Sequence, residues 1–111
     1  MSNTYWLNGK YIQKEDAYVS PLTHTLHYGL GAFEGVRSYI AHDEKSVNIF
    51  RLKEHTERLF ESAKIINVAI NHSVDEVMEA QLGVIKKSQL NDAYIRPLIY
   101  LNDERLGLDI D

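Results

Sequence analysis

The sequence predicts an α+β fold, in which an antiparallel β-sheet carries two α-helices packed on one face. Three features of the sequence predict this fold. Runs of β-prone residues separated by turn residues come first, two stretches with helical periodicity follow, and a period-two alternation returns near residue 95. The chain has 111 residues, which fits one domain with a buried core, and we expect no second domain within it.

Two β-hairpins are predicted ahead of the helices. In the first, Asn8-Gly9 tolerates positive φ and suits a two-residue turn between strands at 5–7 and 10–12. A connector then ends at Pro21. In the second hairpin, the polar segment 42–46 separates two extended arms. Between the hairpins lies HTLHYGLGAFEGVRSY, residues 24–39, whose three glycines allow either a closely packed helix–strand junction or a small-anion pocket.

Two helices are predicted next, followed by a strand. The apolar residues of the first helix recur at helical spacing: Leu52, Leu59, Phe60, Ala63 and Ile66. The second helix opens with a capping box, Ser73 with Glu76. Its predicted buried stripe consists of Val74, Val77, Met78, Leu82 and Ile85. Residues 93–101 then alternate as one strand, and Pro97 places that strand at an edge or makes it locally irregular.

Composition argues against several classes of function. A net charge of −4 argues against a nucleic-acid surface, and no run is long enough for a transmembrane helix. The absence of cysteine excludes disulfides, a thiol nucleophile and a zinc–cysteine site. A cytoplasmic location follows by default. No metal site is expected, because His24 and His27 lack a third ligand at supporting spacing, and we expect His42, His55 and His72 at the surface.

Two groups of residues suggest anion binding, each with an ordinary structural alternative. Arg51 and Arg58 lie on a helix flank that borders the apolar face, where an arginine can fork onto a phosphate. The residues alone favour a solvated role, with pairing to glutamates 54 or 61. Tyr94 and Arg96 project from one face of a strand, where they could bind a small carboxylate. Equally, Tyr94 could be a core residue with its hydroxyl at the rim, and Arg96 could extend to water.

The stretch LHYGLGAFEGVRSY closely resembles the region near the amino terminus of bacterial branched-chain amino acid aminotransferases, of the class IV (fold type IV) pyridoxal phosphate family. The resemblance continues in register through WLNGKYI, FRLKEHTERLFESAKI and AYIRPLIYL, over essentially all 111 residues. It implies that residues 1–111 are the N-terminal small domain. The lysine that forms the Schiff base with pyridoxal 5′-phosphate would then lie in a C-terminal domain outside this chain, which alone is expected to be inactive and to hold no catalytic residue.

The resemblance also implies roles for individual residues. Arg58 matches the arginine that grips the cofactor phosphate, which reverses the preference for a solvated role. The implied substrate-pocket residues are Tyr28, Phe33, Arg37, Tyr94, Arg96, Leu106 and Leu108. Among them, Phe33 lines the site for the apolar side chain, Tyr94 brings its hydroxyl near the substrate carboxylate, and Arg96 accommodates the second carboxylate of glutamate.

Leu106 and Leu108 match a loop that caps the active site of the other subunit in relatives. Arg105 departs from the glycine that relatives often have there, which weakens the match at this loop.

The resemblance implies a transaminase that moves the amino group of leucine, isoleucine or valine to 2-oxoglutarate, with glutamate as the other amino acid. We expect a homo-oligomer, a dimer or larger, with no nucleic-acid or membrane partner. Two class IV alternatives are a D-amino acid aminotransferase and aminodeoxychorismate lyase. A stand-alone, non-catalytic binding or dimerisation module is the alternative from a different class.

Overall fold

A computed structural model describes residues 4–41, 43 and 46–102 of the protein. Three small sheets, with strand orders β1-β2, β3-β7 and β5-β4-β6, take the place of the single predicted sheet, and every pairing between their strands is antiparallel. The elements in chain order are β1 (Thr4–Leu7), β2 (Lys10–Gln13), a 3₁₀ turn η1 (Lys14–Asp16), α1 (His24–Tyr28), β3 (Gly31–Phe33), β4 (Val36–Ile40), β5 (Val47–Ile49), α2 (Leu52–Ile65), α3 (Val74–Ser88), β6 (Ala93–Ile95) and β7 (Leu98–Tyr100).

Both predicted hairpins are present. In the first, β1 pairs with β2, and Asn8 and Gly9 both adopt positive φ, 48° and 96°, as a tight two-residue turn between twisted strands requires. In the second, β4 pairs with β5 with Ile40 opposite Val47, and Ala41 N donates to Ser46 O at 2.8 Å. The segments that separate these strands are therefore the polar ones that the sequence indicated.

The predicted strand over 93–101 is two strands, and Pro97 lies between them. β6 pairs with β4 at the edge of the three-stranded sheet, and β7 pairs with β3. Proline has no N–H to donate to a ladder, so the pairing lapses there. Its carbonyl still accepts from Glu34 N at 3.1 Å, which keeps the two chain segments side by side across the break. The local irregularity predicted for Pro97 is confirmed.

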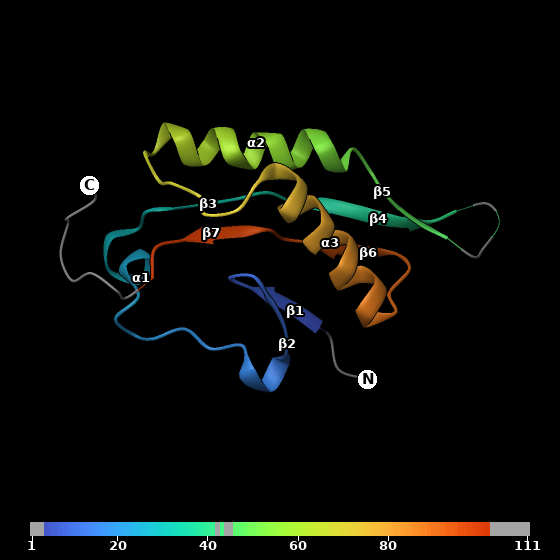
Figure 1. Ribbon diagram of the computed structural model, residues 1–111, viewed down its shortest axis with the longest axis horizontal. Coiled ribbons are helices and arrows are strands. Elements are labelled where there is room, and N and C mark those ends of the chain that lie inside the picture. The colour runs from blue at the N-terminus through green and yellow to red at the C-terminus, as the bar shows by residue number, and fades with distance from the viewer. Residues whose placement is uncertain (1–3, 42, 44–45, 103–111) are drawn as a thin grey trace.

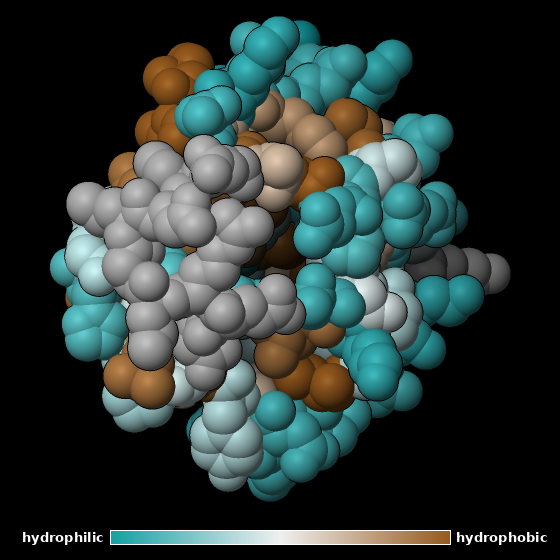
Figure 2. Space-filling view, turned by 60° about the vertical axis from the view of Figure 1, so that its left-hand side comes forward, coloured by the Kyte–Doolittle hydropathy of each residue, from teal (hydrophilic) through white to brown (hydrophobic). Residues whose placement is uncertain are grey.

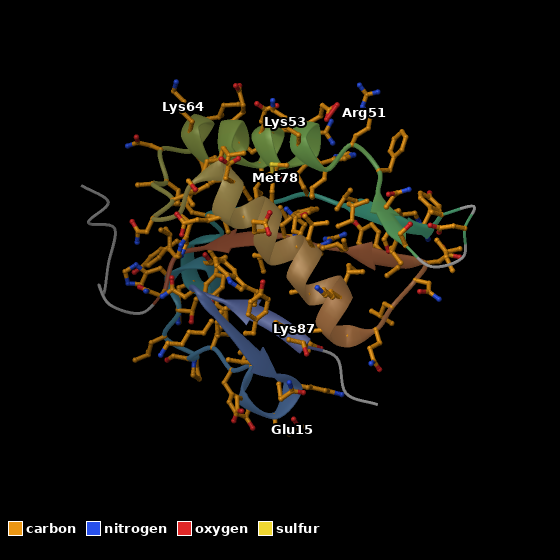
Figure 3. All side chains as sticks on the ribbon, turned by 45° about the vertical axis from the view of Figure 1, so that its right-hand side comes forward. Glu15, Arg51, Lys53, Lys64, Met78 and Lys87 are labelled. Carbon is orange, nitrogen blue, oxygen red and sulfur yellow. The ribbon has the colours of Figure 1, made fainter. Side chains whose placement is uncertain are left out.

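The segments β3–β4 and β6–β7 lie side by side, and together they are called the ribbon below. The two long helices, α2 and α3, pack on one side of the ribbon, and the β1–β2 hairpin lies against α3 (Figure 1). One core cluster joins Ala32, Leu59 and Val77, from β3, α2 and α3. A second joins Val36, Ile85 and Ile95, from β4, α3 and β6. Lys53 and Lys64 on α2, and Arg51 directly before it, project away from the rest of the molecule (Figure 3). No helix in the described part of the chain combines the length and the apolar character that crossing a membrane requires.

The helix α3 begins as predicted, but its buried face is rotated. Ser73 Oγ accepts from Glu76 N at 3.1 Å and Ser73 N donates to Glu76 Oε1 at 3.0 Å, which completes the capping box. Leu82, predicted in the buried stripe, is 40% exposed. The buried face of α3 includes polar residues instead, because the β1–β2 hairpin covers it: Ser88 Oγ accepts from Thr4 N at 2.8 Å.

A buried polar link fixes α2 against α3. Thr56, fully buried on α2, donates its hydroxyl to Leu52 O at 2.7 Å and accepts from Gln81 Nε2 at 2.9 Å. Gln81 Nε2 also lies 3.2 Å from Val77 O. Both side chains are buried, so the bond between them joins two polar groups that water does not reach.

Replacing Thr56 by Val should lower the free energy of unfolding by about 1–3 kcal/mol, because it removes one of the two acceptors of the buried Gln81 amide without changing the shape of the side chain. The double variant T56V/Q81M should regain most of that loss, since both polar partners are then replaced by apolar groups. Chemical denaturation of the two single variants and the double variant measures the coupling. Strictly additive single effects would show that the link contributes nothing.

Candidate functional site

Residues 31–39 form an extended segment whose side chains alternate between the core and the solvent. Ala32, Glu34, Val36 and Ser38 are buried, whereas Gly31, Phe33, Arg37 and Tyr39 are exposed. This period of two runs through β3, the short break and β4. It places Glu34 on the side of the helices and Phe33 on the opposite side, so that adjacent residues contribute to two different groups.

The first group is a buried carboxylate with two basic partners on α2. The Glu34 side chain is 7% exposed. Arg58 Nε donates to Glu34 Oε2 at 2.9 Å and Arg58 Nη2 donates to Oε1 at 2.8 Å, a bidentate pair. His55 Nδ1 lies 3.0 Å from the same Oε1. His55 and Arg58 are three residues apart, so both reach Glu34 from one face of α2.

These contacts set the charge states of the group. The hydrogen bond from Arg58 lowers the pKa of Glu34 most, ahead of the contribution of His55, and together they outweigh the burial that would raise it. The same pair raises the pKa of Arg58 further above its usual value. Glu34 is therefore a carboxylate at neutral pH, and His55 donates to it through Nδ1–H.

The surface positions expected for His55 and His72 are wrong. His55 is only partly exposed because it bonds Glu34, and His72 is half-buried because its ring packs edge-on against Trp6 at 4.9 Å. Arg58 pairs with neither helix neighbour that the sequence offered. Arg51 does follow the solvated alternative, with an exposed ion pair to Glu54 at 3.3 Å. His42 lies outside the described residues.

The second group lies on the exposed face and joins three predicted site residues. Arg96 Nη2 donates to Tyr94 Oη at 2.8 Å. The Arg96 guanidinium carbon lies 4.3 Å from the centre of the Phe33 ring and 5.4 Å from that of Tyr94, so the cation stacks over both rings. Phe33 and Tyr94 are 55% and 53% exposed, so a large part of each ring remains open to a ligand.

Gly35 makes room for this arrangement. A Cβ atom at residue 35 would lie 2.1 Å from Tyr94 Oη and 2.8 Å from Cζ, far inside contact distance. Any larger residue would therefore displace the Tyr94 ring from its position beside Arg96. The close approach of the Tyr94 side chain explains the glycine at residue 35. The two alternatives for residues 24–39, a closely packed junction and a small-anion pocket, are therefore compatible with each other.

The structure also describes two other predicted site residues, of which Arg37 shares this face. Arg37 on β4 is opposite Tyr94 on β6 in the strand register, so both side chains are on the same exposed face. Tyr28 ends α1 and packs edge-on against His24, with ring centroids 5.7 Å apart. Backbone bonds from His24 and Thr25 to Asn102 O and Leu101 O attach α1 beyond the end of β7. Leu106 and Leu108 lie outside the described residues.

The two histidines of α1 differ in their surroundings. His27 Nε2 is 2.7 Å from Pro21 O, whereas the His24 ring is buried edge-on against Tyr28 and its Nε2 has no hydrogen-bond partner among the described residues. Within the described residues no three side chains of the metal-binding types come together.

Several apolar side chains are exposed besides the two aromatic rings. Leu26 on α1 and Leu98 on β7 are 64% and 53% exposed, in addition to the aromatic rings. Seen from the end of the molecule that carries α1, hydrophobic patches lie open between hydrophilic residues (Figure 2). A surface with open apolar patches and two arginines fits a ligand that combines an apolar part with an anion.

Sequence reasoning missed Glu34 and His55. The signal for Glu34 was present: it shares its phase with Ala32 and Val36, so a carboxylate was placed on a core-facing position. Such a residue needs a basic partner, and Arg58 borders the apolar face of the next helix. His55 gave no comparable signal, because its role depends on which turn of α2 faces Glu34.

The sequence of this chain is similar to those of known aminotransferases. The amino-transferase class IV family matches residues 31–110. A branched-chain-amino-acid aminotransferase of Pseudomonas aeruginosa is 47% identical over 103 residues, and one of Escherichia coli K12 is 46% identical over 104. These matches cover 93% and 94% of this chain but 33% of each relative, so the chain spans about a third of their length.

Solved structures of the same group share the fold. A crystal structure of the Escherichia coli branched-chain amino acid aminotransferase superposes with a TM-score of 0.92 at 43% identity, over 100% of this chain and 37% of that one. A second branched-chain amino acid aminotransferase, from T.th. and complexed with N-(5′-phosphopyridoxyl)-L-glutamate, has a TM-score of 0.91 at 38% identity, over 98% of this chain and 36% of that one. The predicted small-domain fold is confirmed by these structures.

The lowered pKa of Glu34 makes a prediction for the pH dependence of stability. A carboxylate whose pKa is lower in the folded state contributes stability above its unfolded pKa of 4.5, and loses it as the pH falls through the folded pKa. The difference in free energy of unfolding between wild type and Glu34→Gln should therefore be largest near pH 7 and shrink below pH 4.5. Denaturation curves of both proteins across this range measure it.

The matched control is Glu54→Gln, which breaks the exposed ion pair between Arg51 and Glu54 at the start of α2. Its effect should be within about 0.5 kcal/mol at every pH. A destabilisation by Glu34→Gln that stays constant from pH 7 down to pH 3 would contradict the assignment of a charged Glu34.

Proposed function

The chain belongs to the amino-transferase class IV family, and from that membership we propose that residues 1–111 are the N-terminal small domain of a branched-chain amino acid aminotransferase. The whole protein would use pyridoxal 5′-phosphate to move the amino group of leucine, isoleucine or valine to 2-oxoglutarate. The observation that supports this most directly is the group Phe33–Tyr94–Arg96, which combines open aromatic surface with a cation. The lysine that bonds the cofactor is proposed to lie in a C-terminal domain.

The residues present fit the phosphate of the cofactor. Arg58 has a side chain 66% exposed, and its guanidinium has five N–H donors, of which two point at Glu34. Three donors are left for a phosphate, which a planar guanidinium recognises well. The bound cofactor would supply the electron sink for the reaction, and this chain would supply the phosphate contact and one wall of the substrate site.

Substrate recognition is proposed for the opposite face of the ribbon. The site must accept a branched alkyl chain from one substrate and a carboxylate from the other. Phe33 offers apolar surface, Arg96 offers charge above it, and the Tyr94 hydroxyl offers a hydrogen bond near the substrate carboxylate. Arg37 and Tyr28 would complete the same wall, and Leu106 and Leu108 would approach the site of a second subunit.

The remaining parts of the proposal concern the whole protein. A homo-oligomer is supported by the exposed apolar residues, which further protein would cover. A cytoplasmic location agrees with the absence of cysteine.

Arg58→Ala in the full-length protein should weaken pyridoxal 5′-phosphate binding by on the order of tenfold or more, because the phosphate loses its charge-assisted hydrogen bonds. Titration of the apoprotein with limiting cofactor, followed through the visible absorption band of the bound cofactor, measures the affinity. Arg51→Ala is the control, since Arg51 is exposed directly before the same helix and pairs with Glu54. An affinity equal to that of wild type in Arg58→Ala would refute the phosphate contact.

Arg96→Met should lower kcat/KM for glutamate and 2-oxoglutarate by roughly 10- to 100-fold, because the second carboxylate loses its cation. The value for leucine should change by less than about threefold, since Met keeps the length and apolar stem of the side chain. Half-reaction rates with each amino acid, including D-amino acids, measure the preference. Equal losses for glutamate and leucine would contradict the assigned role, and turnover of D-amino acids alone would replace the proposed substrate class.

A further inference from the structure

The buried carboxylate behind Arg58 has no part in the functional assignment so far. We propose that Glu34, supported by His55, is a positioning residue that fixes the Arg58 guanidinium so that its outward N–H donors meet a phosphate. This inference rests on the proposed function, because it takes the phosphate of pyridoxal 5′-phosphate as the anion. It adds to that function the reason why this arginine is ordered before the cofactor arrives.

Geometry supports a fixed guanidinium. The two bonds at 2.9 and 2.8 Å engage Nε and Nη2, which is one edge of the planar fork. A guanidinium held by one edge is fixed in both position and plane, so the opposite edge points in a defined direction. The two donors on Nη1 and the second donor on Nη2 are then the ones that face away from Glu34.

Burial supports a rigid anchor. Arg58 itself is largely exposed, and a long side chain on a helix surface would otherwise lose several freely rotating torsions on binding an anion. Glu34 lies on an extended segment between β3 and β4, with its backbone N bonded to Pro97 O at 3.1 Å. The backbone of Glu34 is thus anchored outside α2, and its carboxylate meets Arg58 from a separate part of the chain. Ordering Arg58 in advance lowers the entropic cost of binding the ligand.

His55 holds the carboxylate from the other side. Its Nδ1 bonds Oε1, the same oxygen that accepts from Arg58 Nη2, while Oε2 accepts from Nε. Both carboxylate oxygens therefore have a donor, as a buried carboxylate requires. Rotation of the carboxylate would break all three contacts together, so the group behaves as one unit.

The opposite reading is that Glu34 competes with a phosphate for Arg58. A carboxylate close to an incoming phosphate repels it, and removing that charge would then improve binding. The two interpretations predict changes of opposite sign in the affinity for the phosphate when the charge of Glu34 is removed. The charge-neutral variant Glu34→Gln therefore decides between them. Gln keeps the size of the side chain, but it offers one acceptor oxygen in place of two and presents an N–H₂ to the donors of Arg58 or His55.

The experiment measures the preference of the full-length apoprotein for pyridoxal 5′-phosphate over pyridoxal, which lacks the phosphate. The preference is the dissociation constant for pyridoxal divided by that for pyridoxal 5′-phosphate. Glu34→Gln should lower this ratio on the order of tenfold, with the dissociation constant for pyridoxal unchanged. Glu34→Asp, which keeps the charge but withdraws the carboxylate, should lower it by less. Glu54→Gln is the matched control, on the same helix as Arg58, and it should leave the ratio unchanged.

Action through Arg58 is tested by the double variant E34Q/R58A. If Glu34 only positions Arg58, the double variant has the same preference ratio as Arg58→Ala alone. An unchanged or increased ratio in Glu34→Gln, with Arg58→Ala still losing the preference, would overturn this inference and leave the proposed function intact. If Arg58→Ala keeps the full preference for pyridoxal 5′-phosphate over pyridoxal, both this inference and the proposed phosphate contact of Arg58 are overturned. If Glu34→Gln fails to fold, Glu34→Asp decides by the same ratio.

Discussion

The structure depends on one buried charge. Glu34 lies between β3 and β4 on the core side of the ribbon, where an unpaired carboxylate would cost several kcal/mol. Arg58 and His55 neutralise and bond it, and both come from α2. The register of α2 over the ribbon is thereby fixed to within a turn, because only one face of the helix presents both basic side chains. The apolar contact of Leu59 with Ala32 in the adjacent core is consistent with the same register.

The alternation that buries Glu34 also builds the other face. Phe33 precedes it and Gly35 follows it, and both belong to the exposed side with Arg96 and Tyr94. Three consecutive residues thus contribute to the exposed aromatic group, to the contact with α2 and to the close approach of the Tyr94 ring. A shift of one residue in this segment would exchange its faces, burying Phe33 and exposing the carboxylate. This coupling leaves little room for substitution at residues 33–35.

The sequence alone predicted the elements whose signals are local. The Asn8-Gly9 turn and the Ser73–Glu76 capping box depend on neighbouring residues, and both are present in the structure. Prediction failed for residues whose burial or pairing depends on segments that are distant in the sequence. Leu82 is exposed because the β1–β2 hairpin covers a different face of α3, and Arg58 pairs with a residue 24 positions away instead of one on its own helix. The Tyr94–Arg96 pairing was open to prediction, because a strand places residues two apart on one face.

The two arginines of the proposed site differ in what holds them, and the difference suits their proposed ligands. Arg58 is held by a carboxylate, which fixes its geometry permanently. Arg96 lies over two aromatic rings with a phenol hydroxyl as its hydrogen-bond partner, and within the described residues it makes no ion pair. A guanidinium stacked on rings is attracted to them without being neutralised, so its charge remains available to a ligand. A fixed cation suits the proposed cofactor phosphate, and a cation without a carboxylate partner suits the proposed pocket, which would admit a carboxylate in one half of the reaction and an alkyl chain in the other.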